Sequence, residues 1–87
     1  MSEITSEQCR GARAMLEMSQ EQLAAAANVG LQTVRTFEAE VAEPTANSLR
    51  SIRLALERAG IDLSPDTDAG PVVRLSRAHL ARKETKS

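Results

Sequence analysis

Residues 19–39 read SQEQLAAAANVGLQTVRTFEA, and they constrain the fold more than any other part of the chain. At a helical period they give two short amphipathic helices, 20–27 and 31–39, with only three residues between them. Ser19 can cap the first of these helices, and Gln22 stands where it closes a capping box. Because the connection is so short, the stretch is predicted to form a helix-turn-helix.

The three connecting residues, Asn28, Val29 and Gly30, suit a tight corner. After glycine, asparagine is the residue that best tolerates the left-handed backbone needed at position 28. Ala24 is small enough for the second helix to cross close above it, and Val34 can fill the angle between the two helices. The outward residues of the second helix would then project from a rigid platform that fits the major groove of B-DNA, about 12 Å wide.

Two further helices are predicted, one on each side of this motif. A capping-box pattern, Thr5 with Gln8, precedes a helix over residues 6–16, and Thr45 can cap a fourth helix over residues 45–59. Apolar residues recur at helical spacing on the inward face of all four helices. They are Cys9, Ala12 and Leu16; Leu23, Ala24 and Ala27; Val34 and Phe37; and Leu49, Ile52 and Leu56.

The composition fits a small helical bundle. With one Phe, no Trp and no Tyr, the core must be built from aliphatic residues. The lone cysteine, Cys9, can form no internal disulfide, which indicates a reducing cytoplasm, and it is predicted to be a buried apolar residue rather than a reactive thiol. No apolar run approaches the ~20 residues that span a membrane, so no membrane partner is expected.

After residue 60 the pattern changes from helical to alternating. Residues 61–64 and 72–76 alternate apolar and polar side chains around a stretch rich in turn residues, which predicts a β-hairpin with a long loop. An isolated hairpin is marginal in water, so it must pack on the helices or pair with a second copy to give a homodimer. The predicted units are a helix-turn-helix domain over 1–60, a hairpin and dimerisation element over 61–76, and a flexible basic tail over 77–87.

The motifs SQ-x-x-LA and TVRTFE, within residues 6–63, resemble those of Cro/C1-type (XRE-like) helix-turn-helix proteins. The resemblance implies a mainly α fold: a small lambda-repressor-like bundle of four helices, followed here by the C-terminal β-hairpin. It also implies a cytoplasmic regulator, often dimeric, that binds double-stranded DNA and represses or activates promoters.

The resemblance assigns roles to single positions. Gln20 would anchor a phosphate at the start of its helix, and Arg13 would pair with Glu38. By its chemistry, Gln32 suits adenine, while Arg35 suits guanine or a phosphate. The full set comprises base-reading residues Leu31, Gln32, Thr33, Arg35 and Thr36, phosphate-contacting residues Gln20, Thr45, Asn47 and Arg50, and structural residues Ala24, Asn28, Val34, Arg13 and Glu38.

The loop after the second motif helix departs from the family pattern, which has glycine and basic residues there. Glu40 and Glu43 would repel phosphates, and the formal net charge of the chain is −1. We therefore expect low affinity from one domain, so that dimerisation or a partner becomes necessary. The same acidity suits an alternative, a protein-interaction module such as an antitoxin that autoregulates its operon and binds a partner protein.

An enzyme is the least favoured reading of this sequence. The single histidine, His79, lies in the predicted tail, where it is expected to be a solvated surface residue. The sequence shows no paired carboxylates in a plausible cleft, no metal-ligand spacing and no glycine-rich phosphate loop. We accordingly expect no catalytic residues, no cofactor and no metal.

Overall fold

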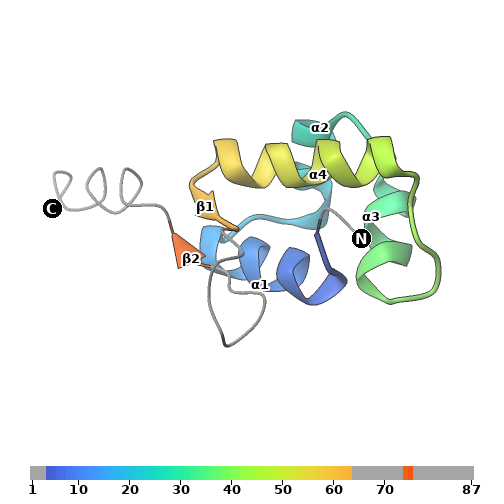
Figure 1. Cartoon of the computed structure of the whole chain (residues 1–87), viewed down its shortest axis with the longest axis horizontal. Coiled ribbons are helices and arrows are strands. Elements are labelled where there is room, and N and C mark those ends of the chain that lie inside the picture. The colour runs from blue at the N-terminus through green and yellow to red at the C-terminus, as the bar shows by residue number, and fades with distance from the viewer. Residues whose placement is uncertain (1–3, 64–73, 76–87) are drawn as a thin grey trace, which may run out of the picture.

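The computed structural model describes residues 4–63 and 74–75. Its four helices are α1 (Ser6–Leu16), α2 (Gln20–Ala27), α3 (Leu31–Glu38) and α4 (Ala46–Arg58), shown in Figure 1. The prediction of a mainly helical, four-helix fold is confirmed, and the bounds of the first two helices are right. The third helix ends one residue earlier than predicted, and Thr45 and Ala59 flank α4 as its caps rather than belonging to it.

Side-chain caps determine where α1 and α2 begin. The backbone N–H of Gln8 donates to Thr5 Oγ1 at 3.1 Å, and the backbone N–H of Thr5 donates to Gln8 Oε1 at 2.9 Å. Ser19 and Gln22 exchange the equivalent pair of hydrogen bonds at 2.9 and 2.8 Å. Both predicted capping boxes are therefore present, and each satisfies backbone donors that a helix start otherwise leaves unpaired.

The corner between α2 and α3 depends on a left-handed residue. Asn28 has a φ of 56°, and the following N–H, that of Val29, donates to the carbonyl of Ala24 at 3.0 Å. Two glutamates, Glu17 after α1 and Glu40 after α3, also have positive φ, at 53° and 60°. Neither was expected, because glutamate lacks the short side chain that eases this conformation in asparagine.

The core lies where the four helices meet. Leu23, Val34, Ile52 and Leu56 are fully buried, and the other inward residues are buried as predicted, except for Leu16, which is half-buried against the core. Two core members fall outside the predicted faces, Ile4 before α1 and Ile61 after α4; Ala55, on α4, was also missed. The core is aliphatic apart from Phe37 and Cys9, as the composition requires.

Two strands of two residues each follow α4. β1 (Ile61–Asp62) pairs antiparallel with β2 (Arg74–Leu75), with Ile61 opposite Leu75 and Asp62 opposite Arg74. This is shorter than the predicted hairpin. Residues 64–73 and 76–87, which include its predicted loop, part of each strand and the predicted tail, lie outside the described residues.

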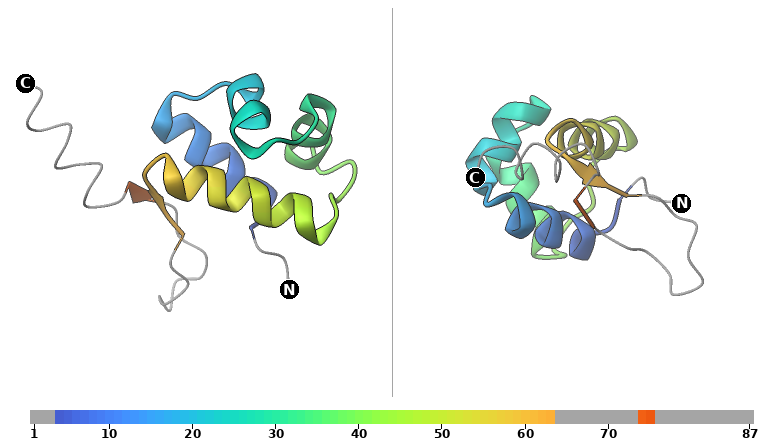
Figure 2. Two further views of the ribbon diagram at one scale, coloured as in Figure 1. Left: turned by 90° about the horizontal axis from the view of Figure 1, so that it is seen from above. Right: turned by 90° about the vertical axis from the view of Figure 1, so that its left-hand side faces the viewer.

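The strands and α3 lie at opposite ends of the bundle. In Figures 1 and 2, α1 and α4 run lengthwise between them, and α2 lies beside α3. The fold therefore presents α3 as the outer helix at one end of the molecule.

Within residues 4–63 and 74–75, no helix has the length and apolar character needed to cross a membrane.

Candidate nucleic-acid interface

The two faces of α3 differ in burial and in chemistry. Val34 and Phe37 point into the core and are 0% and 5% exposed. Gln32 and Arg35 are exposed to solvent. The periodicity of the helix separates these pairs, so a hydrogen-bonding amide and a guanidinium stand on a helix whose other side is fixed by packing.

The other three candidate base readers, Leu31, Thr33 and Thr36, are half-buried, and two of them also make contacts within the fold. Leu31 packs against the core. Thr36 donates its hydroxyl proton to the carbonyl of Gln32, at 2.9 Å within the same helix. Because that donor is engaged, Thr36 can offer an outside group its hydroxyl oxygen as an acceptor or its methyl group for apolar contact. Thr33 is placed one turn before it.

Glu38, at the end of α3, is a buried carboxylate that receives four hydrogen bonds from side chains. Arg13 donates from Nε to Oε2 and from Nη2 to Oε1, both at 2.6 Å. Cys9 Sγ donates to Oε2 at 3.1 Å, and Gln20 Nε2 donates to Oε1 at 3.0 Å. Arg10 Nη1 donates to the backbone carbonyl of Glu38. This Glu38 cluster (Cys9, Arg13, Gln20 and Glu38) joins α1, α2 and α3.

Protonation in the Glu38 cluster follows from these contacts. Burial by itself raises the pKa of Glu38, but the hydrogen bonds from Arg13, Cys9 and Gln20 and the charge of Arg13 outweigh it, so the pKa is lowered. The pKa of Arg13 is raised, chiefly by its hydrogen bond to Glu38. Burial, followed by the hydrogen bond to Glu38, raises the pKa of the Cys9 thiol far above its usual range. At neutral pH the cluster thus holds a carboxylate, a guanidinium and a protonated thiol.

Gln20 is held in this cluster at the start of α2. Its side chain is half-buried, and one amide N–H is used by Glu38. A glutamine amide carries two N–H donors, so the second can still be offered to a phosphate. The hydrogen bond to Glu38 therefore fixes the position of Gln20, which sequence reasoning had predicted only as a phosphate contact.

The N-terminus of α3 differs from those of α1, α2 and α4. Its N-cap residue, Gly30, makes no side-chain capping hydrogen bond, whereas Thr5, Ser19 and Thr45 each accept one. Uncapped N–H groups and the helix dipole together place partial positive charge at this end. That charge lies next to the exposed Gln32 in the first turn of α3.

The remaining phosphate candidates lie around the start of α4. Thr45 is exposed, but its hydroxyl accepts from the backbone N–H of Ser48 at 3.2 Å and contacts Ser48 Oγ at 3.1 Å. Its hydroxyl is therefore engaged in capping. Asn47 and Arg50 are exposed on the first two turns of α4, where no hydrogen bond or ion pair to another described residue engages their side chains.

The acidic loop, residues 40–43, is attached to the end of α3. The N–H of Val41 donates to the carbonyl of Thr36 at 2.9 Å, which holds the loop beside the last candidate base reader. Glu40 and Glu43 are both exposed, and Arg10 Nη1 lies 3.7 Å from Glu40 Oε2.

Within the described residues, no group of three or more metal-ligating side chains is placed to hold a metal ion.

Sequence reasoning missed two contacts to Glu38. Cys9 was interpreted only as an apolar residue, and Arg10 was given no role, although both contact Glu38. The available signal was Glu38 itself, a charged residue at a position that the helical period of α3 places on the buried face. Its partners on α1 and α2 are distant in sequence, so no local pattern identifies them.

Comparison with known proteins bears on most of the helical part. The family model described as Helix-turn-helix (HTH_3) matches residues 10–63, from the second turn of α1 through β1. This match covers more than half of the chain and includes α2, the corner at Asn28 and α3. Among curated proteins, none matches the chain.

Proposed function

The chain belongs to the Cro/C1-type helix-turn-helix family (HTH_3), and we propose that it is a sequence-specific regulator that binds double-stranded DNA at promoters. The observation that carries this proposal is the exposed pair Gln32 and Arg35 on a helix fixed from behind by Val34 and Phe37. A helix of this width enters the major groove, where base edges differ in their pattern of donors and acceptors.

Within the groove, each side chain of α3 has a role set by its chemistry. Gln32 can pair through its amide with N6 and N7 of adenine, and Arg35 can pair with O6 and N7 of guanine or with a phosphate. Thr33 and Thr36 contribute short contacts at the groove edge. Leu31, which also packs on the core, is limited to a thymine methyl group.

Contacts to phosphates would set the register of the domain on the duplex. We assign these to Gln20 at the start of α2 and to Asn47 and Arg50 on α4. Thr45 acts more through the cap that positions α4 than through a contact of its own. These contacts carry no base preference, so they contribute affinity to every sequence alike.

A dimer completes the proposal. The acidic loop beside α3 opposes binding by one domain, and two linked domains raise the effective affinity. We assign dimerisation to residues 61–76, because β1 and β2 lie at the end of the bundle opposite α3 (Figure 1). Such a dimer bound across a promoter in the cytoplasm would act as a repressor by excluding other proteins from the site.

The experiment is a binding titration of the purified chain with promoter fragments at about 50 mM salt and at higher salt. Gln32→Ala should cost about 1–3 kcal/mol on the preferred site and relax the preference at one base pair. Gln20→Ala should weaken binding to all sequences alike. Arg58→Ala, which replaces an exposed arginine in the last turn of α4, is the control and should leave binding unchanged.

Equal losses for Gln32→Ala and Gln20→Ala on every sequence would contradict the division between base and phosphate contacts. If no fragment were preferred even at about 50 mM salt, the regulatory role would fail. The alternative function, an antitoxin-like module that binds a partner protein, would then be favoured. The acidic loop and its exposed Val41 are the observations that favour this alternative.

A further inference from the structure

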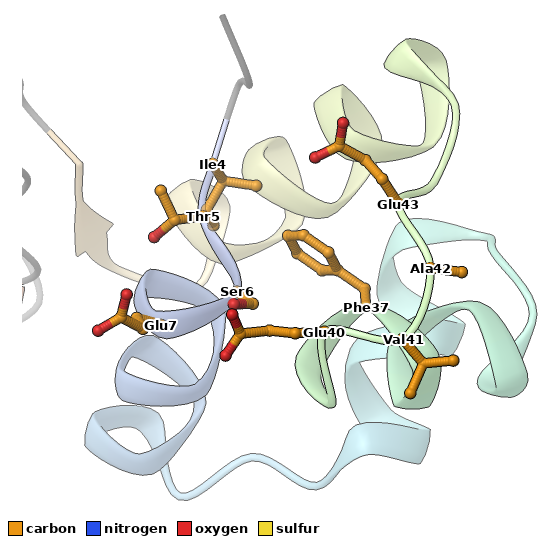
Figure 3. A pocket seen from close by; sticks show the side chains of 9 residues that line it. All are labelled: Ile4, Thr5, Ser6, Glu7, Phe37, Glu40, Val41, Ala42 and Glu43. Atoms are coloured by element: carbon orange, nitrogen blue, oxygen red, sulfur yellow. The ribbon is translucent and has the colours of Figure 1, made fainter.

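A hollow of about 360 Å³ lies between the start of α1 and the loop after α3 (Figure 3). The chain from Ile4 to Glu7 forms one wall, and Phe37 with residues 40–43 forms the other. Its volume is at the lower end of the range of sites that bind small ligands. The residues assigned to DNA contacts do not line it.

Apolar residues lie at the base of the hollow and at one point of its rim, and polar groups supply most of its lining surface. Ile4 and Phe37 form the base, and in Figure 3 the ring of Phe37 points toward Ile4. Val41 stands at the rim and is 75% exposed, more than any other large apolar side chain in the described part of the chain. A valine this exposed gains free energy when a partner covers it.

The charge around the hollow is negative. Glu7, Glu40 and Glu43 all line it, and in Figure 3 Glu40 extends from the loop toward the start of α1, while Glu43 extends upward from the far end of the loop. The nearby cation Arg10 lies 3.7 Å from Glu40. Among the described residues, no ion pair engages Glu7 or Glu43. A hollow with an exposed valine and carboxylates at its rim is complementary to an apolar side chain flanked by cations.

We propose that this hollow binds a short basic segment of a partner protein, with an apolar side chain between lysine or arginine residues. The apolar side chain enters beside Phe37 and Val41, and the flanking cations pair with Glu7 and Glu43. Nucleic acid is a poor occupant, because its phosphates would face three carboxylates.

Because the hollow lies beside α3, a partner bound in it would affect DNA binding. This consequence is the only part of the inference that rests on the proposed function. The loop that forms one wall is hydrogen-bonded to the end of α3 through Val41 and Thr36. A bound basic segment neutralises the loop carboxylates and adds cations beside the helix. It therefore raises affinity for DNA and steepens its dependence on salt.

The test uses the full chain and a fluorescein-labelled peptide of sequence lysine-arginine-leucine-arginine-lysine, followed by fluorescence anisotropy without DNA. We expect saturable binding that weakens as salt rises. Glu43→Gln and Glu7→Gln should each weaken it about two- to fivefold, and Val41→Ser should weaken it as well. The matched controls, Glu21→Gln on α2 and Leu54→Ser on α4, replace exposed residues outside the hollow and should leave binding unchanged.

A second peptide, with serine in place of leucine, has the same charge and should bind more weakly. Equal binding of the two peptides, or an equal loss with Glu21→Gln, would reduce the effect to general electrostatic attraction and overturn the proposal. Absence of saturable binding at about 50 mM salt would overturn it too. So would a change in the oligomeric state of the protein alone on Glu43→Gln, which would make the hollow an interface between copies. Since no DNA is present, failure here is separate from failure of the proposed DNA binding.

Discussion

Replacing Glu38 with glutamine removes one buried charge while keeping the shape of the side chain. The Glu38 side chain is 3% exposed, and each of its oxygens accepts from two donors. In Glu38→Gln one oxygen becomes an NH₂ group. In either orientation of the amide, that group meets two donors, one of them from Arg13, so hydrogen bonds are lost together with the ion pair.

The cost can be estimated from the burial of the two partners. Breaking a buried ion pair by changing one partner costs about 3–5 kcal/mol. The Arg13 side chain is 20% exposed and can regain water, so we place Glu38→Gln at the lower end, about 3 kcal/mol. In a domain of this size each kcal/mol lowers Tm by about 4–8 °C, so Tm should fall by roughly 12–24 °C.

Urea and thermal denaturation followed by circular dichroism measure this loss. The matched control is Glu57→Gln, which changes a more exposed glutamate paired with Arg53 one turn away on α4 and should cost less than about 1 kcal/mol. If Glu38→Gln cost no more than Glu57→Gln, the buried cluster would not support the arrangement of α1, α2 and α3 as argued.

The same carboxylate makes stability depend on pH. Because the pKa of Glu38 is lower in the folded chain than in the unfolded chain, its contribution is fully present above the unfolded value of about 4.3. It is lost as the pH falls from there through the folded pKa. Glu38→Gln should lack this part of the acid dependence, and an unchanged acid profile would contradict the assignment.

Further predictions concern the corner, the cap of α2 and the buried thiol. Asn28→Ala should lower the free energy of unfolding by about 1–2 kcal/mol in urea titrations because of its positive φ, whereas Asn28→Gly should not strain the corner. Ser19→Ala should lower the free energy of unfolding by about 1 kcal/mol through loss of the α2 cap. A loss no larger than that of an exposed Ser→Ala change outside a cap would refute this. Cys9 should react with a disulfide reagent only as the chain unfolds, because its thiol is buried and its pKa is raised; rapid reaction of the native chain would contradict this.

Much of the helical fold could be predicted because its signals are local. Ser19 and Gln22 lie three residues apart, and the backbone at Asn28 follows from the short connection and the tolerance of asparagine for positive φ. The inward stripes followed from a period of 3.6 residues. The positive φ of Glu17 could not be predicted this way, because nothing in that side chain favours it.

The parts that could not be predicted depend on contacts between distant residues. Ile4 lies in a lead-in without periodicity, and its burial is decided by the helices that close over it. The bond from Cys9 to Glu38 spans 29 positions and joins a weak donor to a carboxylate, a pairing that no motif encodes. The pairing of Arg13 with Glu38 could be expected only through resemblance to a family, and the hollow beside Phe37 only from the structure.

The most direct test of DNA recognition by α3 is selection of bound duplexes from a random pool by the full chain, repeated with Gln32→Ala. We predict enrichment of one half-site motif, present twice at the spacing that the dimer sets, and a relaxed preference at one base pair per half-site in the variant. A pool without an enriched motif at about 50 mM salt, or an identical motif with Gln32→Ala, would contradict base recognition through α3.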